Sequence, residues 1–380
     1  MIRVAFVGVG HISRRHFTAL AKLRDQAEVV AVCDVVEERA RTAAESAGAR
    51  PYLSFPLRTT MGEEALVMND PLLGNFAVVT DEVHPDLETA VRAIHGMGVG
   101  LVEIQEFWGK TVVEVTDADL DRAGALLQER GMRVAAIGSQ LFKPVRLGHV
   151  RRGEVARDPH FQQDLDLLRG QIRVARALGA PVIRAYAFRR DDMVGLGNPS
   201  PRLPRGGPLP DQMLEKIAQG LRIAAALAAD AGLILGLENV RSCWANSGHN
   251  TGQILGAVDH PALQAIWDPG NDYVSGGQPY PEGYQAVRGR VCHVHVKDAH
   301  VVDHATGLTA WDAVGRGEVD YVAQFGALRR DGYAGTLALE THWHPTGPGG
   351  EPPDKIRDSQ ISFEGVERVL AASLAGGASV

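Results

Sequence analysis

The sequence is poor in cysteine and lacks a net positive charge. Three cysteines, Cys33, Cys243 and Cys292, occur in 380 residues, far apart and outside any C-x-x-C pair. They form no zinc ribbon and cannot all pair, which is typical of a reducing compartment. Acidic residues outnumber basic ones by 46 to 39, and the formal net charge is -7. Proteins that hold a polyanion carry a basic surface, so nucleic acid is not an expected partner.

Long apolar runs are also missing. The longest, residues 223–237, is interrupted by Asp230 and Gly232 and is too short to span a bilayer. Residues 1–10, MIRVAFVGVG, enter a strand and a glycine turn directly, without the basic, apolar and small-residue regions of a secretory leader. We therefore expect a cytoplasmic protein with no membrane partner, and the sequence leaves a homo-oligomer open.

The chain does contain enough apolar sequence for a large core. Hydrophobic residues make up 45% of it, charged residues make up 22%, and there are 43 glycines. This composition is typical of a soluble globular protein with many turns. The length accommodates one large α/β domain, alone or with a smaller appendage.

The N-terminal part reads as strand, glycine turn and helix, followed by a second strand and helix. The apolar runs cover residues 2–7 and 28–35, and the helical patterns extend to about residue 22 and over residues 37–49. Gly8 and Gly10 stand where a dinucleotide fold has phosphate-binding glycines, and Asp34 stands where it has a ribose-binding carboxylate. Ser13 occupies the third glycine position, so the motif alone is weak.

Three segments of this part, VAFVGVGHISRRHFTAL, VVAVCDVVEERARTAAESAGA and PYLSF, together resemble the opening of the Gfo/Idh/MocA family of NAD(P)-dependent sugar dehydrogenases. The resemblance covers residues 1–55 and implies a half-Rossmann βαβα segment with Gly8, Gly10 and Asp34 as cofactor-binding residues. The family's remaining nucleotide-domain strands, Glu-Lys-Pro segment and C-terminal sheet do not follow. Because a dinucleotide is normally held across two halves, we expect residues 1–56 to be a remnant that does not bind NAD(P).

Residues 57–74 are an expected linker, because they combine proline, glycine and mixed charge without a sustained period. From residue 75 to residue 375, apolar runs alternate with helical patterns, for example over residues 86–98, 117–131, 165–179, 213–232 and 321–332. Eight buried strands separated by helices predict a (β/α)8 TIM barrel, with a doubly wound sheet as the alternative. The expected strands are residues 75–82, 99–106, 133–140, 181–188, 233–239, 263–271, 291–298 and 335–343.

Polar side chains end four consecutive strands of this series, and in a barrel such ends converge on one mouth. The stretch CHVHVKDAH, residues 292–300, places two imidazoles and one ammonium at every second position, so all three leave the same face of a strand. The strand-end residues are, in chain order, Glu238, Asn239, Asp268, His293, His295, Lys297, Glu340 and His342.

These acids would repel one another at a shared mouth unless a cation neutralised them. Taken singly, each carboxylate has another explanation as a helix cap, and each histidine as a hydrogen-bonded core residue. Their coincidence on four adjacent strands favours a shared divalent cation. Oxygen ligands with one imidazole suit Mn²⁺, Mg²⁺ or Co²⁺ better than a thiolate-binding metal, and Zn²⁺ is also compatible.

The motifs LEN, WDPGN, HVHVKD and LGAPVIRAYAF, with the segment VGRGEVDYVAQFGALRRDGYAGTLALET, resemble the xylose isomerase-like barrel superfamily of sugar isomerases and epimerases over residues 74–372. The resemblance implies one metal held by Glu238, Asp268, His295 and Glu340, with Glu238 and Glu340 exchanging the substrate proton. It also implies that Lys297 reaches a substrate oxygen; an ion pair with a neighbouring acid such as Asp298 is the alternative.

The predicted function is therefore a metal-dependent isomerase or epimerase of an unphosphorylated sugar, keto-sugar or cyclitol that works through an enediolate, with Mn²⁺ as the favoured metal. The same chemistry permits a lyase of the inosose dehydratase or 3-keto-glycoside eliminase type. The dehydrogenase-like N-terminal segment mildly favours a lyase, because such oxidoreductases make keto-sugars. An endonuclease IV-like enzyme and a non-catalytic barrel are the remaining alternatives.

Further expected substrate contacts are less specific. Aromatic residues are more often packed than bound to a sugar, and a histidine in the glycine-rich stretch NSGHNTG is equally well explained as an exposed turn residue. The residues expected to contact substrate, besides Lys297, are His293, Glu103, Arg184, Trp108 and His249.

Overall fold

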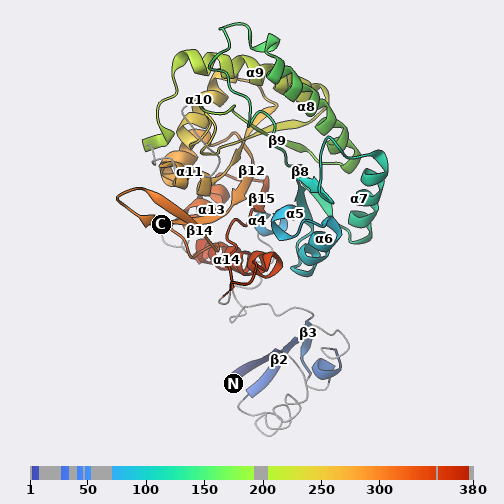
Figure 1. Ribbon diagram of the computed structural model, residues 1–380. Coiled ribbons are helices and arrows are strands. Elements are labelled where there is room, and N and C mark those ends of the chain that lie inside the picture. The colour runs from blue at the N-terminus through green and yellow to red at the C-terminus, as the bar shows by residue number, and fades with distance from the viewer. Residues whose placement is uncertain are drawn as a thin grey trace. The chain divides into compact units, whose positions relative to one another are not determined.

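Residues 2–7, 27–33, 41–45, 48–52, 71–191, 204–347 and 350–375 are described by a computed structural model of the chain (Figure 1). The chain divides into two compact units, Met1–Leu66 and Val67–Val380. This division falls inside the expected linker, while the domain boundaries at residues 56 and 75 stay a prediction. Among the described residues, no helix is long and apolar enough to cross a membrane.

The smaller unit contains a three-stranded parallel sheet with the strand order β1-β2-β3, formed by Ile2–Val7, Ala27–Cys33 and Arg50–Tyr52. Residues 41–45 are helical, inside the second predicted helix. The strand order is that of the first half of a dinucleotide-binding fold. The short third strand was not predicted. Gly8, Gly10 and Asp34 lie outside the described residues, so both the cofactor-binding and the remnant interpretations stay predictions.

Eight parallel strands close into a barrel in the larger unit (Figure 1). The last strand, β15, pairs in parallel with the first, β4, which closes the sheet on itself. All eight strands lie inside the predicted ranges, which confirms the TIM barrel over the doubly wound sheet. Their bounds are β4 Phe76–Val79, β5 Leu101–Ile104, β8 Arg133–Ile137, β9 Val182–Tyr186, β10 Ile234–Glu238, β11 Leu263–Trp267, β12 Val291–Val296 and β15 Thr336–Leu339.

Helices surround this sheet, and the five predicted ones are confirmed. Four of them begin at an N-cap residue whose side chain accepts a hydrogen bond from a backbone N–H of the first turn. These N-cap residues are Asp86, Thr116, Asp158 and Asp320. The helices are α6 Leu87–Gly96, α7 Asp117–Glu129, α8 Pro159–Leu178, α9 Asp211–Asp230 and α13 Tyr321–Arg330. Shorter helical segments are α4 Pro71–Gly74, α5 Thr80–Val83, η1 Val155–Arg157, η2 Pro204–Gly206, α11 Pro269–Ser275, η3 Pro279–Gly283 and α12 Tyr284–Val287.

Two further helices, α10 Gly248–Val258 and α14 Lys355–Ala375, were not predicted. The expectation that NSGHNTG is a loop is wrong, because Ser247 caps α10 by accepting a hydrogen bond from the Asn250 N–H group at 3.2 Å. Glycine at position 248 permits a close approach of two backbones: a Cβ there would lie 2.2 Å from the Gly283 carbonyl oxygen. Glycine lowers the helix propensity of α10, but at position 248 it allows the helix to pack closely against the backbone of Gly283.

The barrel interior is filled mainly by small side chains from the strands. Ala77, Leu101, Ala135 and Ala338 form one buried cluster, and Ala136, Val182 and Ile266 form another. The larger core lies between the sheet and the helices and includes the stacked rings of Phe142 and Phe161. A close-packed interior fixes the backbone at the strand ends, where the polar residues lie.

Two β-hairpins extend from the barrel strands, and neither was predicted. The first joins β6 Glu106–Phe107 to β7 Lys110–Thr111, and the second joins β13 Asp298–Asp303 to β14 Leu308–Asp312. The second hairpin projects away from the body of the barrel (Figure 1). Its base is held by the Asp298 carboxylate, which accepts hydrogen bonds from the backbone N–H groups of residues 299, 315, 317 and 319.

Removal of residues 1–67 is expected to leave the barrel folded. All eight barrel strands, including the closing β4–β15 pair, belong to the larger unit, so its core does not need the smaller sheet. Far-UV circular dichroism and thermal unfolding of the full and shortened chains measure this. Loss of the cooperative transition in the shortened chain would contradict the expectation.

Candidate metal centre

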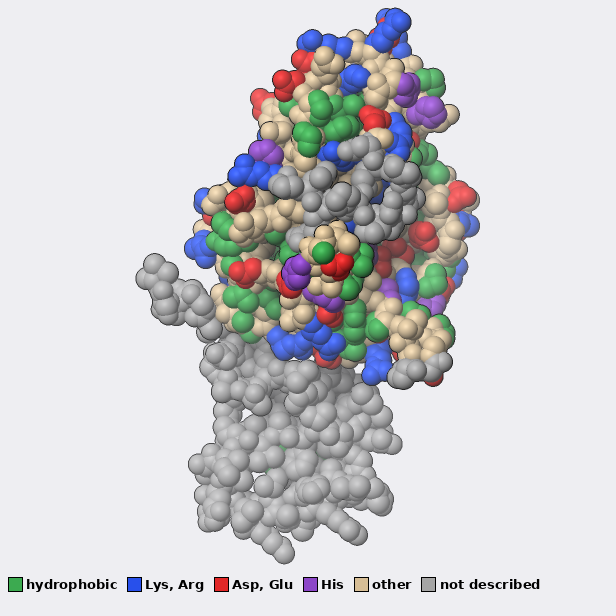
Figure 2. All heavy atoms as spheres, turned by 60° about the vertical axis from the view of Figure 1, so that its left-hand side comes forward, with side chains coloured by type: hydrophobic (Ala, Val, Ile, Leu, Met, Phe, Trp, Pro, Cys, Tyr) green, Lys and Arg blue, Asp and Glu red, His purple; other side chains and the backbone are tan. Residues whose placement is uncertain are grey.

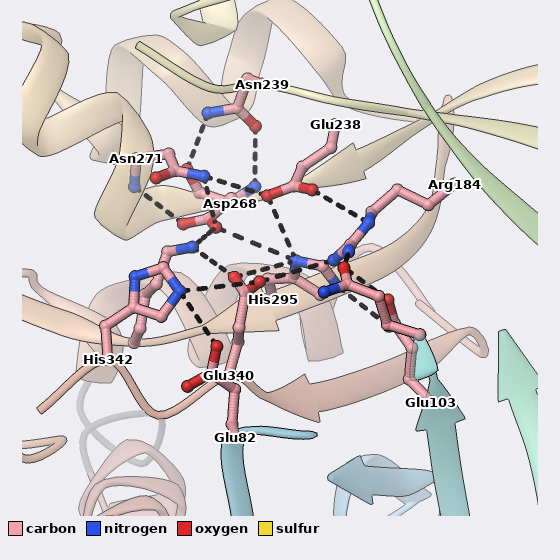
Figure 3. A network of polar contacts seen from close by, with 12 residues as sticks. Glu82, Glu103, Arg184, Glu238, Asn239, Asp268, Asn271, His295, Glu340 and His342 are labelled. Carbon is pink, nitrogen blue, oxygen red and sulfur yellow. Dashed lines mark hydrogen bonds and ion pairs between the residues drawn. The ribbon is translucent and has the colours of Figure 1, made fainter. Parts of the chain in front are cut away.

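Four consecutive strands bring one ligand atom each to a common point at the mouth of the barrel. Glu238, Asp268, His295 and Glu340 follow or end β10, β11, β12 and β15, and their ligand atoms all lie within 4.8 Å of one another. His295 Nδ1 is 3.4 Å from Glu238 Oε1, 3.4 Å from Glu340 Oε2 and 4.0 Å from Asp268 Oδ2. All four side chains are buried. Figure 3 shows the three carboxylates turned toward this side of the imidazole.

Asp268 is positioned by the start of α11. Its Oδ1 accepts a hydrogen bond from the backbone N–H of Asn271 at 2.8 Å, so the helix-cap explanation also holds for this residue. Its Oδ2 accepts from Asn271 Nδ2 at 2.8 Å and remains turned toward His295. Asn239, expected as a strand-end ligand, instead bonds the backbone N–H and carbonyl of Asp268, both at 2.8 Å. These two hydrogen bonds between the Asn239 side chain and the Asp268 backbone therefore hold the ends of β10 and β11 together (Figure 3).

His295 is oriented by Glu103, which comes from β5 on the other side of the barrel. The Nε2 nitrogen lies 3.0 Å from Glu103 Oε2, and since a carboxylate accepts, Nε2–H donates. In the neutral ring, which is the form that binds a metal, Nδ1 then carries the lone pair. This nitrogen is buried and has no hydrogen-bond partner among the described residues. A carboxylate behind a histidine fixes its tautomer and raises its basicity as a ligand.

Glu103 and His293 lie behind His295, where the sequence also predicts His293 as an imidazole that supports the metal ligand; their roles as substrate contacts stay predictions. His293 Nε2 is 3.1 Å from the same Glu103 oxygen, and its ring meets that of His295 edge-on at 5.3 Å. Both side chains are fully buried. Since their polar atoms face one another, we propose that they position His295.

Arg184, from β9, joins the acids on one side of the cluster. Its guanidinium lies 3.2 Å from Glu103 Oε1, 3.4 Å from Glu340 Oε1 and 3.5 Å from Glu238 Oε2. It also donates to Gln105, a residue that the sequence analysis did not assign. A planar guanidinium with several donors can hold separate carboxylates at a fixed spacing. Its expected role as a substrate contact stays a prediction.

Lys297 joins the acids on the other side. Its Nζ lies 2.8 Å from Asp268 Oδ2 and also contacts Glu340 Oε2. The alternative of an ion pair with an acid therefore holds for Asp268 and Glu340, while the Asp298 carboxylate accepts backbone hydrogen bonds at the base of the β13–β14 hairpin. The Lys297 ammonium group therefore contacts two carboxylates of the cluster directly.

The pKa values reflect the crowding of acids. Burial raises the pKa of Asp268, and the charges of Glu238 and Glu340 add to this rise. Burial opposes protonation of His295, but the charges of Glu103, Glu340 and Glu238 outweigh it and raise the pKa well above its usual value. A site that draws protons onto its own ligands has a strong affinity for positive charge.

The residues present fit a divalent cation. When His295 is neutral, as a metal ligand must be, four buried carboxylates face two buried cations, and the cluster carries two negative charges in excess. Its members are Glu103, Glu238, Asp268, Glu340, Arg184 and Lys297. One divalent ion would balance this excess, since unpaired buried charge is costly. The unpartnered His295 Nδ1 turned toward carboxylate oxygens is the donor arrangement that such an ion requires.

Trp108 and His249 lie outside this group. Trp108 occupies the turn between β6 and β7, where the Arg122 guanidinium covers its ring at 4.0 Å from the ring centre. His249 is exposed in the first turn of α10, with Nε2 3.2 Å from Gln253 Nε2. Their roles as substrate contacts stay predictions without support from these positions.

The structure adds Trp311, which sequence reasoning missed. This residue of β14 lies edge-on to His342 at 4.9 Å, and Lys297 Nζ is 5.4 Å from its ring centre. His342 Nε2 in turn lies 3.8 Å from Glu340 Oε1 and 3.6 Å from Glu82 Oε1. The turn sequence Ala-Thr-Gly at residues 305–307 was the available signal for the hairpin, because a short turn that contains glycine can join two strands.

Glutamine at position 103 is expected to weaken metal binding by about 10- to 100-fold, because it removes the carboxylate that holds His295 while keeping the side-chain volume. Titration of Mn²⁺ into the purified protein, followed by calorimetry, measures the change. Glu88→Gln, at an exposed site on α6, is the matched control and is expected to bind as wild type does. Unchanged affinity in Glu103→Gln would refute the positioning role.

The sequence matches two family models. The model described as "Xylose isomerase-like TIM barrel" matches residues 91–364. The model described as "Oxidoreductase family, NAD-binding Rossmann fold" matches residues 2–86, and its last part covers β4 and α5 of the barrel. None of the curated proteins compared is similar to the chain.

Several solved structures share the barrel fold. A D-allulose 3-epimerase from Methylomonas sp., in complex with D-allulose, is 18% identical with a TM-score of 0.56 and covers 77% of this chain and 96% of its own. The IOLI protein, with a bound zinc atom, is 15% identical with a TM-score of 0.59, covering 78% and 98%. The probable 3-DHS dehydratase AsbF from Bacillus anthracis is 16% identical with a TM-score of 0.55, covering 76% and 98%. At these identities the likeness shows the fold alone.

Proposed function

Because the chain belongs to the xylose isomerase-like TIM barrel family, we propose that its barrel is a divalent-metal-dependent isomerase or epimerase of a sugar, keto-sugar or cyclitol. The observation that carries this proposal is the convergence of Glu238, Asp268, His295 and Glu340 on one point. The D-allulose and L-ribulose 3-epimerases among the solved neighbours, and the zinc atom of the IOLI structure, support it. Mn²⁺ is the proposed metal, and Mg²⁺, Co²⁺ and Zn²⁺ accept the same donors.

When bound, such an ion supplies Lewis-acid polarisation of a carbonyl group, which acidifies the neighbouring C–H bond. Glu238 and Glu340 are the proposed proton carriers. They come from β10 and β15, with two strands between them in the barrel, so they approach a substrate from different sides. One removes the proton and the other returns a proton to the second face.

Arg184 and Lys297 support this exchange. Arg184 contacts both glutamates and so fixes their spacing. It also opposes the burial that would otherwise keep them protonated; with His295 it outweighs burial and Glu340 and lowers the pKa of Glu238 to about 2. Lys297, between Glu340 and the Trp311 ring, is the proposed donor to a substrate oxygen.

The test is proton exchange in deuterium oxide. Purified protein is incubated with ketohexoses, inososes and 3-keto-glycosides, with and without Mn²⁺, and the products are analysed by NMR. Deuterium incorporation at one carbon, dependent on metal and without loss of water or glycone, is the expected result. Failure to exchange protons in any member of the panel would remove the proposal.

A lyase of the same family is the second candidate. The match of residues 2–86 to an oxidoreductase family favours it, because oxidation of a sugar to its keto form prepares elimination of a β-leaving group. The probable dehydratase among the solved neighbours has the same fold. Release of water or of the glycone in the same assay would identify this reaction in place of epimerisation.

An endonuclease IV-like activity has less support. Figure 2 shows basic and acidic side chains interspersed across the described part of one face of the barrel, and the net charge of the chain is -7. Recognition of a nucleic acid backbone relies on a concentration of basic side chains.

A further inference from the structure

Two half-buried basic side chains, Lys143 and Arg189, have no acidic partner in the part of the chain that the structure describes. Lys143 lies in the loop that follows β8, and its Nζ stands 4.6 Å from the centre of the Tyr186 ring. Arg189 lies three residues beyond the end of β9. Elsewhere in the mouth, the basic groups Arg184 and Lys297 each contact two or more carboxylates.

Hydrogen bonds hold the two residues in adjoining segments. The Tyr186 N–H donates to the Leu141 carbonyl at 3.0 Å, and the Arg189 N–H donates to the Val145 carbonyl at 2.8 Å. Arg189 also forms an antiparallel bridge with Cys243, beyond the end of β10. The loops that follow three neighbouring strands, β8, β9 and β10, therefore run side by side at one side of the mouth.

Both cations act on the same buried thiol, that of Cys243. Burial raises the pKa of the Cys243 thiol to about 12, and Lys143 and Arg189 both act against this rise. Burial likewise lowers the pKa of Lys143, while the charge of Glu238 acts to raise it. Lys143 thus lies within electrostatic reach of the metal centre, with Arg189 close to the same buried thiol.

Lys143 and Arg189 are not needed to neutralise the carboxylates of the metal centre. A divalent ion, with Arg184 and Lys297, would neutralise the four carboxylates of the centre, so the acids of that cluster would no longer compensate Lys143 and Arg189. Positive charge removed from water without a counter-charge is costly, and a negatively charged ligand group would compensate it. The position of the pair, outside the cluster but beside it, suits a substituent some carbons away from the reacting ones.

We propose that Lys143 and Arg189 form an anion-binding subsite for a carboxylate or phosphate group of the substrate, distal to the carbons that react. The inference rests on the proposed function and narrows the substrate class to acidic or phosphorylated sugars, so its phosphorylated branch departs from the unphosphorylated substrate that the sequence predicts. The hairpin that carries Trp311 follows β12, which is four strands from β8 around the barrel, so it begins on the opposite side of the mouth from Lys143. A sugar held between them would present its charged end to Lys143 and Arg189.

Binding of matched ligands tests the subsite without turnover. D-fructose, D-fructuronate and D-fructose 6-phosphate differ only at the terminal carbon, and inorganic phosphate serves as the simple anion. Their dissociation constants are measured by calorimetry with the Mn²⁺-loaded full chain. If the subsite exists, at least one of the two charged sugars should have a dissociation constant about tenfold lower than that of D-fructose. Which of the two binds more tightly distinguishes a carboxylate site from a phosphate site.

Lys143→Met and Arg189→Met are each expected to reduce this preference to about twofold while leaving D-fructose binding unchanged, and Lys143→Arg is expected to retain it. Lys110→Met, which removes a lysine paired with Asp119 near α7, is the matched control and is expected to keep the preference. Equal affinity for neutral and charged sugars, a preference that survives both methionine variants, or no binding of any anion at millimolar concentration would overturn the subsite. An anion preference without proton exchange would instead remove the proposed function and leave the subsite standing.

Discussion

Glutamine in place of Glu340 is expected to reduce turnover by about 10³-fold while leaving the fold intact. The substitution removes a proton carrier and a metal ligand at once, yet it keeps the side-chain volume. Burial acts to raise the pKa of Glu340, but Lys297 and His295 hold it well below its usual value, so loss of the charge is expected to lower stability without unfolding the barrel. Steady-state kinetics on the best substrate of the sugar panel, together with thermal unfolding, measures both parts.

Glu238→Gln is expected to behave in the same way, because Glu238 lies at the same distance from His295 Nδ1 as Glu340 does. Glu129→Gln, at the exposed end of α7, is the control that changes the net charge equally. If either buried variant kept more than about a tenth of wild-type turnover, proton transfer by these carboxylates would be excluded.

Methionine in place of Arg184 is expected to lower the free energy of unfolding by about 3–5 kcal/mol at neutral pH. The substitution keeps much of the buried volume but leaves the carboxylates of Glu103, Glu238 and Glu340 without the guanidinium that all three contact. Urea denaturation of the two proteins measures the difference. Arg152→Met removes an exposed ion pair with Glu215 and is expected to cost about 1 kcal/mol or less.

The pH dependence of this loss has a definite sign. The pKa of Glu238 is lowered from 4.5 to about 2, so the stability from its ionised form is present above about pH 4.5 and is lost as the pH falls toward 2. Without Arg184 that pKa rises, and protonation relieves the repulsion at a higher pH. The difference between wild type and Arg184→Met should therefore shrink as the pH falls below neutral. A constant difference would show that lost packing, and not charge, causes the destabilisation.

Much of the barrel could be predicted because its strands are buried on both faces and read as short apolar runs, such as residues 233–239 and 335–343. Helix α10 was missed because three glycines lower its propensity, whereas its packing against Gly283 is a property of the folded chain. The β13–β14 hairpin was missed because its strands are partly exposed and mixed in character, so they carry no strong period.

The grouping of the proposed metal ligands could also be predicted, because the carboxyl ends of consecutive barrel strands meet at one mouth. The role of Glu103 could not, since it depends on His295 and His293 sharing one oxygen across the barrel. The proposed role of Lys143 was equally hidden. A lysine in a loop is expected to be solvated, and only the folded arrangement leaves it half-buried with no acidic partner among the described residues. A role that depends on the absence of a contact cannot be predicted from the sequence, because contacts between distant residues are known only from the structure.

Elemental analysis tests the central claim most directly, namely that Glu238, Asp268, His295 and Glu340 hold one divalent ion. After equilibration with Mn²⁺ and removal of unbound metal, the full chain should retain about one ion, and Asp268→Asn and His295→Gln should retain about a tenth of that or less. A folded wild-type chain that retains no metal, or variants that retain as much as wild type, would contradict the metal centre and the chemistry built on it.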